Sequence, residues 1–238
     1  MTQPFFAVLT HRGAIRVSGP DSHHFLQNLI TSDVEEIDKQ GAGFGALLTP
    51  QGKILFDFLI YRDGDAYLLD APLETLPDLA KRLTFYKLRA KVEIENLSGK
   101  AAVVAVWNSS LPENLRGIST PDPRLPALGF RLVGSEEEIK SAFEASGAVE
   151  KTEADYAAHR IGLAVPEAPF DFAYSEIFPH DADMDQLSGV SFSKGCYVGQ
   201  EVVSRVHHRG TARKRFIAAV SNTPLPEPGT PVQADGKA

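Results

Sequence analysis

Short apolar runs separated by turn residues dominate the first third of the chain and predict a β-meander. The runs 43–48 and 54–61 flank a segment whose proline and glycine stand where a β-turn needs them. An Asp63-Gly64 pair then separates the second run from residues 67–69, which is a strong hairpin signal. We therefore expect consecutive antiparallel strands in this region.

Apolar residues with helical spacing predict four helices among the strands. Residues 20–30 and 73–86 each carry leucines on one side of a helix. Ser135 begins a capping box, and Thr152 caps a further helix that runs to about residue 163. The remaining short apolar runs predict strands at 8–9, 15–17, 92–94, 101–107, 130–133 and 216–220.

The order of these elements predicts an α+β fold, because strands and helices follow one another without the regular alternation that builds a parallel sheet. Two long segments lack a period. Residues 108–126, rich in proline, asparagine and serine, predict a surface loop. Residues 166–187 mix proline, phenylalanine and aspartate. We interpret them as an ordered, functional loop, because irregular segments of that length are seldom idle.

Composition describes an ordinary soluble globular protein, with 238 residues, 43% hydrophobic and 23% charged. No run of about 18 apolar residues occurs, so we expect neither a membrane span nor a membrane partner. The first residues do not resemble a secretory signal. A single cysteine excludes an internal disulfide and a four-cysteine cluster site within one chain. It also favours a reducing compartment, and we predict a cytoplasmic location.

Charge is unevenly distributed along the chain. The net charge of −7 argues against a nucleic-acid partner. Two segments are nevertheless basic and free of acids: residues 81–91, the first basic island, and residues 205–215, the second basic island, each with five lysines and arginines. Together they suggest recognition of a small anion. The alternative is that each island is a solvated face.

The strongest candidate for chemistry is the octet 194–201, which holds the only cysteine between two glycines. Glycines four apart beside reactive side chains predict a shaped loop. Cys196, as a thiolate stabilised by Lys194, could ligate a cluster shared with a partner or take part in thiol exchange. A small buried hydrophobe in a tight turn is the alternative for Cys196. Gln200 and Glu201 could serve only to hold the loop.

Two acidic features have open interpretations. Asp57 interrupts the apolar run 54–60, where an unpaired ionised carboxylate facing a core would be costly. Asp57 therefore faces either solvent or a cavity that holds a partner. The run of His180, Asp181, Asp183 and Asp185 resembles a metal site only loosely, and we favour a solvated loop and predict no metal ligand.

The octet and its flanks resemble the YgfZ-type family of folate-binding proteins, relatives of the glycine-cleavage T-protein that include the mitochondrial iron–sulfur assembly factor of this type. Further segments that resemble the family are 25–34, 47–54, 85–92, 189–193 and 207–215. The resemblance implies a ring of subdomains around a central folate-type pocket, ending in a β-barrel. About 37 residues follow Glu201, so we expect that barrel to be truncated or reduced.

The resemblance also implies a domain division and a function. We divide the chain into residues 1–100 with the β-meander, residues 101–200 ending in the octet, and residues 201–238 as the incomplete start of the barrel. The implied function is a folate-binding accessory protein in maturation or repair of iron–sulfur proteins. Its ligand would be tetrahydrofolate or a related folate, and its partners iron–sulfur assembly proteins or client enzymes.

Two alternatives stay open. One is a tetrahydrofolate-dependent one-carbon transferase of the aminomethyltransferase type, and the other is a non-catalytic scaffold, so enzymatic activity is undecided. The transferases carry a pterin-binding glutamate where this chain has Gly162. Cys196 and Asp57 are the candidate catalytic residues. The candidate folate-binding residues are Asp57, Lys87, Arg89, Lys194, Tyr197, Gln200, Glu201 and Arg205.

Overall fold

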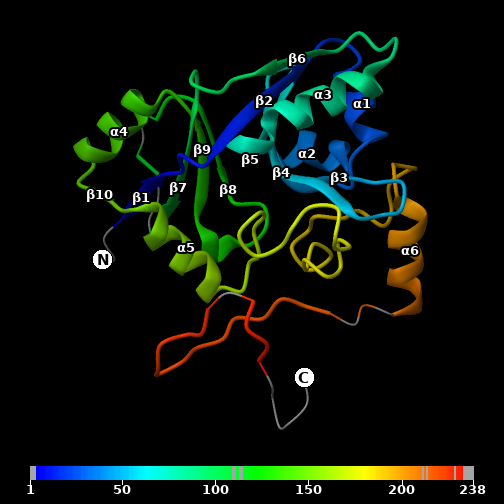
Figure 1. Cartoon of the computed structure of the whole chain (residues 1–238). Helices are drawn as coiled ribbons and strands as arrows, with labels where there is room; N and C mark the ends of the chain where they lie inside the picture. The colour runs from blue at the N-terminus through cyan, green and yellow to red at the C-terminus, as the bar shows by residue number, and fades with distance from the viewer. Residues whose placement is uncertain are drawn as a thin grey trace.

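The computed structural model consists of two five-stranded sheets packed face to face, with helices on their outer sides (Figure 1). It describes residues 4–108, 111–112, 115–210, 212, 214–227 and 229–232. Within these ranges, no helix has the length and apolar character that crossing a membrane requires. The mixture of sheets and helices confirms the α+β class.

The first sheet, the meander sheet, has the strand order β3-β4-β5-β2-β6 and contains the two predicted hairpins. All of its neighbouring strands are antiparallel. The β3–β4 turn and the Asp63-Gly64 turn lie where the sequence predicts them. The strands are β2 (Arg12–Ser18), β3 (Ala42–Leu48), β4 (Ile54–Asp63), β5 (Ala66–Pro72) and β6 (Glu93–Asn96).

Strand β4 divides the interior into two clusters, because successive side chains of a strand point to opposite faces. Phe58 and Ile60 belong to the helix-side cluster, which α1 (Ser22–Gln27), α2 (Val34–Gln40) and α3 (Leu76–Lys87) cover. A 3₁₀ turn, Leu73–Thr75, leads into α3. Leu59 and Tyr61 belong to the inter-sheet cluster instead.

The second sheet, the mixed sheet, has the order β10-β1-β7-β9-β8, in which only β10 is parallel to its neighbour. Its outer face packs against α4 (Glu136–Ala145) through Phe6, Val104 and Phe143. Ser135 and Thr152 cap α4 and α5 (Glu153–Gly162) as predicted. The strands are β1 (Phe5–Val8), β7 (Ala102–Trp107), β8 (Ile118–Pro121), β9 (Phe130–Gly134) and β10 (Val149–Glu150), and a 3₁₀ turn spans Pro126–Leu128.

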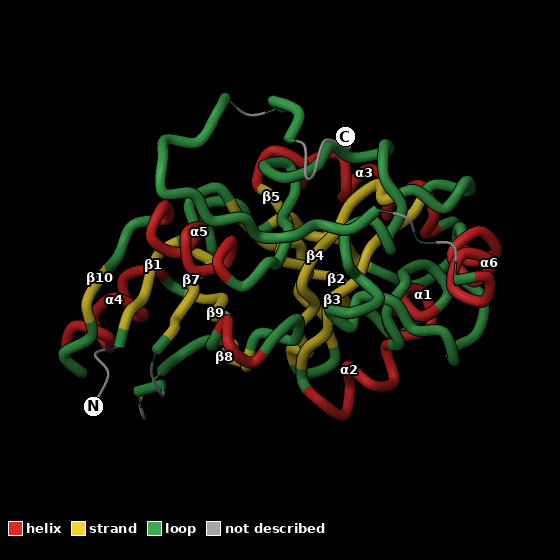
Figure 2. The backbone as a smooth tube through the Cα atoms, turned by 90° about the horizontal axis from the view of Figure 1, so that it is seen from below, coloured by secondary structure: helices red, strands yellow, loops and turns green. Residues whose placement is uncertain are grey.

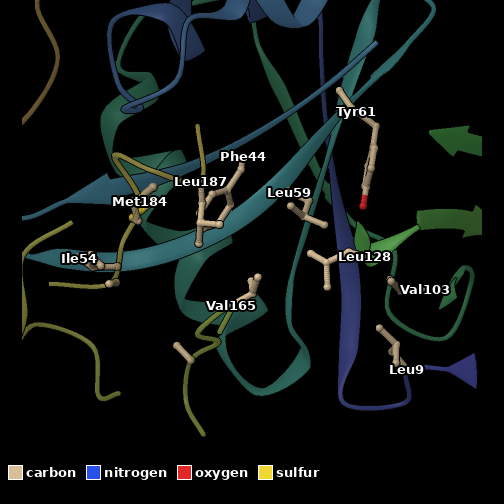
Figure 3. Close-up of a cluster of buried hydrophobic side chains, with 14 of the residues drawn as sticks. Leu9, Phe44, Ile54, Leu59, Tyr61, Val103, Leu128, Val165, Met184 and Leu187 are labelled. Carbon is tan, nitrogen blue, oxygen red and sulfur yellow. The ribbon is translucent and has the colours of Figure 1, made fainter. Parts of the chain in front are cut away.

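Both views place α6 (Gln200–Arg209) at the end of the molecule opposite α4 and β10 (Figure 1; Figure 2). The long segment between α5 and α6 runs across the region between the sheets without regular secondary structure. It is nevertheless part of the core. Val165, Met184 and Leu187 pack in the inter-sheet cluster with Leu59 and Leu128 (Figure 3). The prediction of an ordered loop over 166–187 is confirmed.

Three local predictions were wrong. Residues 108–126 contain strand β8, which pairs with β9 about ten residues further on. The composition of β8 gives no strand signal, because the strand is held by this pairing. The octet ends as a helix, because α6 begins at Gln200 directly after Gly199 adopts a left-handed conformation. Residues 216–220 form no strand, and Ile217 and Val220 are exposed.

Candidate functional site

The octet rests on the β3–β4 turn, which brings together two motifs about 150 residues apart in sequence. Gly199 has a φ of 81°, and a Cβ there would stand 2.6 Å from the carbonyl oxygen of Thr49. Gly52 of the turn has a φ of 83°, and a Cβ there would stand 3.2 Å from the carbonyl oxygen of Gly199. Glycine is required on both sides of this contact because no side chain fits between the two backbones.

A second contact ties the octet to the segment that follows α1. The Lys194 ammonium donates to the carbonyl oxygen of Ser32 at 2.6 Å and to that of Ile30 at 3.0 Å. The buried Thr31 hydroxyl donates to the carbonyl oxygen of Gly189 at 2.6 Å, and the Ser191 amide donates to the Thr31 carbonyl oxygen at 2.9 Å. The loop is therefore held in one position by buried hydrogen bonds from two directions.

Cys196 lies on the surface of this loop as a free, exposed thiol. The alternative of a small buried hydrophobe is wrong. Its neighbour Gly195 is exposed too, with open space where a Cβ would stand. Cys196 thus projects from a loop that Lys194 and Gly199 hold against the protein.

Lys194 and Tyr197 lie beneath the thiol and face inward. Burial lowers the pKa of Lys194 to about 8, and its ammonium stands 5.5 Å from the centre of the Tyr197 ring. Burial raises the pKa of Tyr197 to about 12, and its buried hydroxyl has no hydrogen-bond partner within the described ranges. Since two carbonyl groups hold the Lys194 ammonium, Lys194 positions the loop rather than reaching out to a ligand.

The three remaining candidate residues in or near the octet, Gln200, Glu201 and Arg205, lie on α6. Gln200 donates to the carbonyl oxygen of Gly195 at 3.4 Å, which closes the loop around Cys196. Glu201 and Arg205, both exposed, form an ion pair at 2.5 Å one helical turn apart. This arrangement agrees with the reading of Gln200 as a residue that holds the loop.

Asp57 points to the inter-sheet side of β4 and is buried, so it does not face solvent. Its Oδ1 accepts a hydrogen bond of 2.6 Å from the hydroxyl of Tyr174. Burial raises the pKa of Asp57, and the Tyr174 hydrogen bond and the charge of Arg12 only partly oppose that rise. Among the described residues no other side chain hydrogen-bonds to Asp57, so its second carboxylate oxygen can accept from another donor.

A buried ionic network surrounds this carboxylate between the sheets. Arg12 donates to Asp70 at 2.5 Å and to Glu167 at 2.5 Å. Glu167 also faces Arg160, whose Nε stands 3.1 Å from Oε2. Burial alone would raise the pKa of Glu167, but Arg12 and the neighbouring cations hold it well below its usual value.

Sequence reasoning missed Tyr174, Arg12 and Glu167 as members of this network. Arg12 falls between the predicted strands 8–9 and 15–17, and Tyr174 and Glu167 fall in the loop that has no period. A proline-rich loop with charged residues gives no sign of which of them is buried. The only available signal was Asp57 itself, whose position in an apolar strand left two possibilities, solvent or a cavity that holds a partner.

The two basic islands differ in their ion pairing. In the second island Arg205 pairs with Glu201, and Arg215 pairs with Asp185 at 2.5 Å and with Asp183 at 3.2 Å. Arg213 lies outside the described residues. The first island, which includes Lys87 and Arg89 at the end of α3, forms no ion pair with any residue that the structure describes.

The acidic run at 180–185 is packed rather than solvated, contrary to our expectation. His180 and Asp183 are buried, and Arg215 also donates to the His180 carbonyl oxygen at 2.5 Å. Burial lowers the pKa of His180. The aspartates thus anchor the chain beyond α6 to the long loop through Arg215.

Comparison with known proteins identifies the family of this chain. Residues 8–131 match the family described as the GCVT N-terminal domain. The chain belongs to the GCVT N-terminal domain family. The predicted resemblance to relatives of the glycine-cleavage T-protein is therefore confirmed.

Two fungal relatives of this GCVT-family chain carry the name "Iron-sulfur cluster assembly factor IBA57 homolog, mitochondrial". The relative from Mycosarcoma maydis is 37% identical over 92% of this chain and 59% of its own length. That from Pyricularia oryzae is 33% identical over 90% of this chain and 57% of its own length. The chain thus spans less than two thirds of these relatives.

A solved structure shares the fold. The glycine cleavage system aminomethyltransferase T from Bartonella henselae superposes with a TM-score of 0.70 at 14% sequence identity, covering 87% of this chain and 64% of the other. This similarity confirms a fold like that of the T-protein. At this identity it carries no conclusion about activity.

Our prediction of a cytoplasmic location is wrong, because the relatives that match most of this GCVT-family chain are named as mitochondrial proteins. A single cysteine indicates redox conditions and not a cellular address.

Proposed function

We propose that this chain is an accessory factor in the maturation of iron–sulfur proteins, in which Cys196 supplies one ligand to a cluster held jointly with a partner. The observation that carries the proposal is one exposed thiol on a loop fixed by Lys194 and Gly199. The names of the fungal relatives support the same function.

A cluster needs more ligands than this chain offers, so a partner must supply the others. Iron–sulfur clusters are held by about four protein ligands, most often cysteines. This chain has one cysteine, and within the described residues no group of three or more His, Cys, Asp and Glu side chains could hold a metal. Cys196 therefore acts with ligands from another protein or a second copy. Its exposure permits that approach, and its fixed loop limits the entropy lost on ligation.

In this proposal Asp57 would bind the pterin ring of tetrahydrofolate. A pterin presents N–H donors on its edge, and Asp57 offers a carboxylate oxygen beside the one that Tyr174 already holds. Lys87 and Arg89 lie at the end of α3, which covers the opposite face of β4, so we do not assign the anionic glutamate tail to them. Gly162, at the end of α5, provides no carboxylate but leaves open space where a side chain would stand. Asp57 thus becomes the main polar contact to a pterin.

Replacement of Cys196 by serine tests the cluster proposal. We expect Cys196→Ser to abolish a cluster reconstituted anaerobically from ferrous iron and sulfide on the mixture of this protein with an iron–sulfur carrier protein. The measurement is the visible absorption of the complex after gel filtration. Ser193→Ala, an exposed change in the same loop, is the control. A Cys196→Ser protein that carries the cluster as well as the wild type would exclude Cys196 as a ligand.

The aminomethyltransferase alternative depends on Asp57 rather than on Cys196. It predicts methylene-tetrahydrofolate formation from an aminomethyl donor, and loss of that turnover in Asp57→Asn. Binding of tetrahydrofolate without turnover, weakened by Asp57→Asn, would support the accessory function. Isothermal titration calorimetry and a turnover assay on the same preparations separate the two.

A further inference from the structure

The solvent-facing side of α3 carries an unusual concentration of unpaired positive charge. Lys81 and Arg82 lie on the helix, and Lys87, Arg89 and Lys91 lie at or just beyond its end. None of these five side chains forms an ion pair with any residue that the structure describes. On a protein with a net charge of −7, this surface is where an acidic partner would meet attraction rather than repulsion.

Exposed apolar side chains stand among these cations. Phe85 is 69% exposed and Leu88 is 85% exposed. The opposite face of α3 packs into the core, where Leu76, Leu79 and Leu83 are buried in the helix-side cluster. Phe85 and Leu88 therefore do not belong to this core and are exposed to solvent.

A hollow of about 450 Å³ lies beside this face, between α3 and the start of β4. Asp78, Lys81, Arg82 and Phe85 line it from the helix at the spacing i, i+3, i+4, i+7, which is one stripe of an α-helix. Leu55 and Phe56 of β4 line it as well. The hollow combines apolar walls with cations at its rim.

We propose that this α3 surface docks an acidic segment of a partner protein, which inserts one apolar side chain into the hollow. Burial of an apolar anchor supplies most of the affinity at such interfaces, whereas exposed ion pairs at a rim contribute little individually. The cations would instead accelerate association with an acidic partner and select it over others. The partner class is therefore an acidic peptide segment with a leucine or phenylalanine anchor.

The α3 surface is distinct from the site around Asp57. Phe56 belongs to the helix-side cluster and Asp57 points the other way, between the sheets. A small ligand at Asp57 would therefore lie on the opposite face of β4 from the hollow. The proposed docking involves neither Cys196 nor Asp57, so failure of the Cys196 proposal would leave it intact.

Binding of a synthetic acidic peptide tests this inference. The probe is a fluorescein-labelled peptide of glutamates around a single leucine, with two matched peptides that replace the leucine by serine or the glutamates by glutamines. We expect fluorescence anisotropy to show saturable binding of the first peptide, weakened by added salt. Both matched peptides should bind at least about tenfold more weakly, a loss of about 1.4 kcal/mol.

Protein variants complete the test. Lys81→Glu with Arg82→Glu, and separately Phe85→Ser, should each weaken binding at least about tenfold. The control is Lys39→Glu with Lys100→Glu, which changes the net charge equally through two exposed lysines on other elements. Melting curves verify that all variants fold.

Three results would overturn the inference. The first is an equal loss in the control variant, which indicates a general charge effect. The second is equal binding of the serine peptide, which removes the anchor. The third is displacement of the peptide by phosphatidylglycerol vesicles or duplex DNA at lower concentrations than by unlabelled peptide, which assigns the surface to a lipid or nucleic acid.

Discussion

Several charged side chains are buried together in the region between the sheets. Glu167 is enclosed by Arg12 at 2.5 Å, Arg160 at 3.1 Å and His11 at 3.6 Å. A carboxylate in that position is stabilised only as an anion, which is why its pKa lies well below the usual value although burial alone would raise it. Removing one partner of such a pair leaves the others unpaired in a medium that solvates them poorly.

Glu167→Gln should therefore lower the free energy of unfolding by about 3–5 kcal/mol at pH 7. Because the folded-state pKa of Glu167 is lowered, its contribution is present above the ordinary pKa near 4.5 and is lost as the pH falls below it. Urea titrations at pH 7 and at pH 4 should show a smaller loss on acidification in the variant than in the wild type. Glu176→Gln, at an exposed position, is the control. A wild-type pH dependence in Glu167→Gln would show that other carboxylates govern it.

At the scale of elements, the octet is a loop whose shape depends on contact with a distant turn. Its two glycines have different roles, although they look alike in sequence. Gly199 meets the Thr49 carbonyl oxygen and has a positive φ, whereas Gly195 faces open space. Lys194 fastens the same loop from below through Ile30 and Ser32.

Gly199→Ala should be destabilising by more than about 1–2 kcal/mol, the ordinary cost of an alanine in a left-handed conformation, because a clash with Thr49 adds to it. Gly195→Ala, in the same octet, should change stability by less than about 0.5 kcal/mol. Differential scanning calorimetry of both variants measures this contrast. Equal effects of the two substitutions would mean that the octet does not rest on the β3–β4 turn.

At the scale of the whole molecule, the two sheets and the long loop share one inter-sheet cluster. Leu59 of the meander sheet, Val103 of the mixed sheet and Val165 of the loop all belong to it (Figure 3). Separating the two sheets would expose the apolar inner faces of both to water. The two halves should therefore unfold together.

Two probes native to the chain test that cooperativity. Trp107, the single tryptophan, is buried in the mixed sheet, and Cys196, the single cysteine, is exposed beside the meander sheet and accepts a thiol-reactive fluorophore. Urea unfolding followed by both signals should give coincident midpoints, as a two-state transition requires. Separate midpoints would indicate that the two sheets unfold independently of each other.

Much of the local structure follows from the sequence. The hairpins around β4, the caps at Ser135 and Thr152, and the placement of α3 are local, because turn residues and apolar spacing act over a few positions. Strand β8 and helix α6 were missed because β8 is held by pairing with β9 and α6 starts from the packed Gly199.

The candidate site likewise combines features that the sequence predicts locally with features that depend on tertiary packing. The sequence by itself predicted that Cys196 lies on a glycine-shaped loop and that Asp57 faces either solvent or a cavity that holds a partner. Only the tertiary structure decided that Tyr174, 117 residues away, is that partner, that Lys194 turns inward, and that Arg215 of the second basic island is neutralised by aspartates of the long loop. The physical reason is that periodicity and turn chemistry are local, whereas burial and charge pairing depend on which distant segments meet.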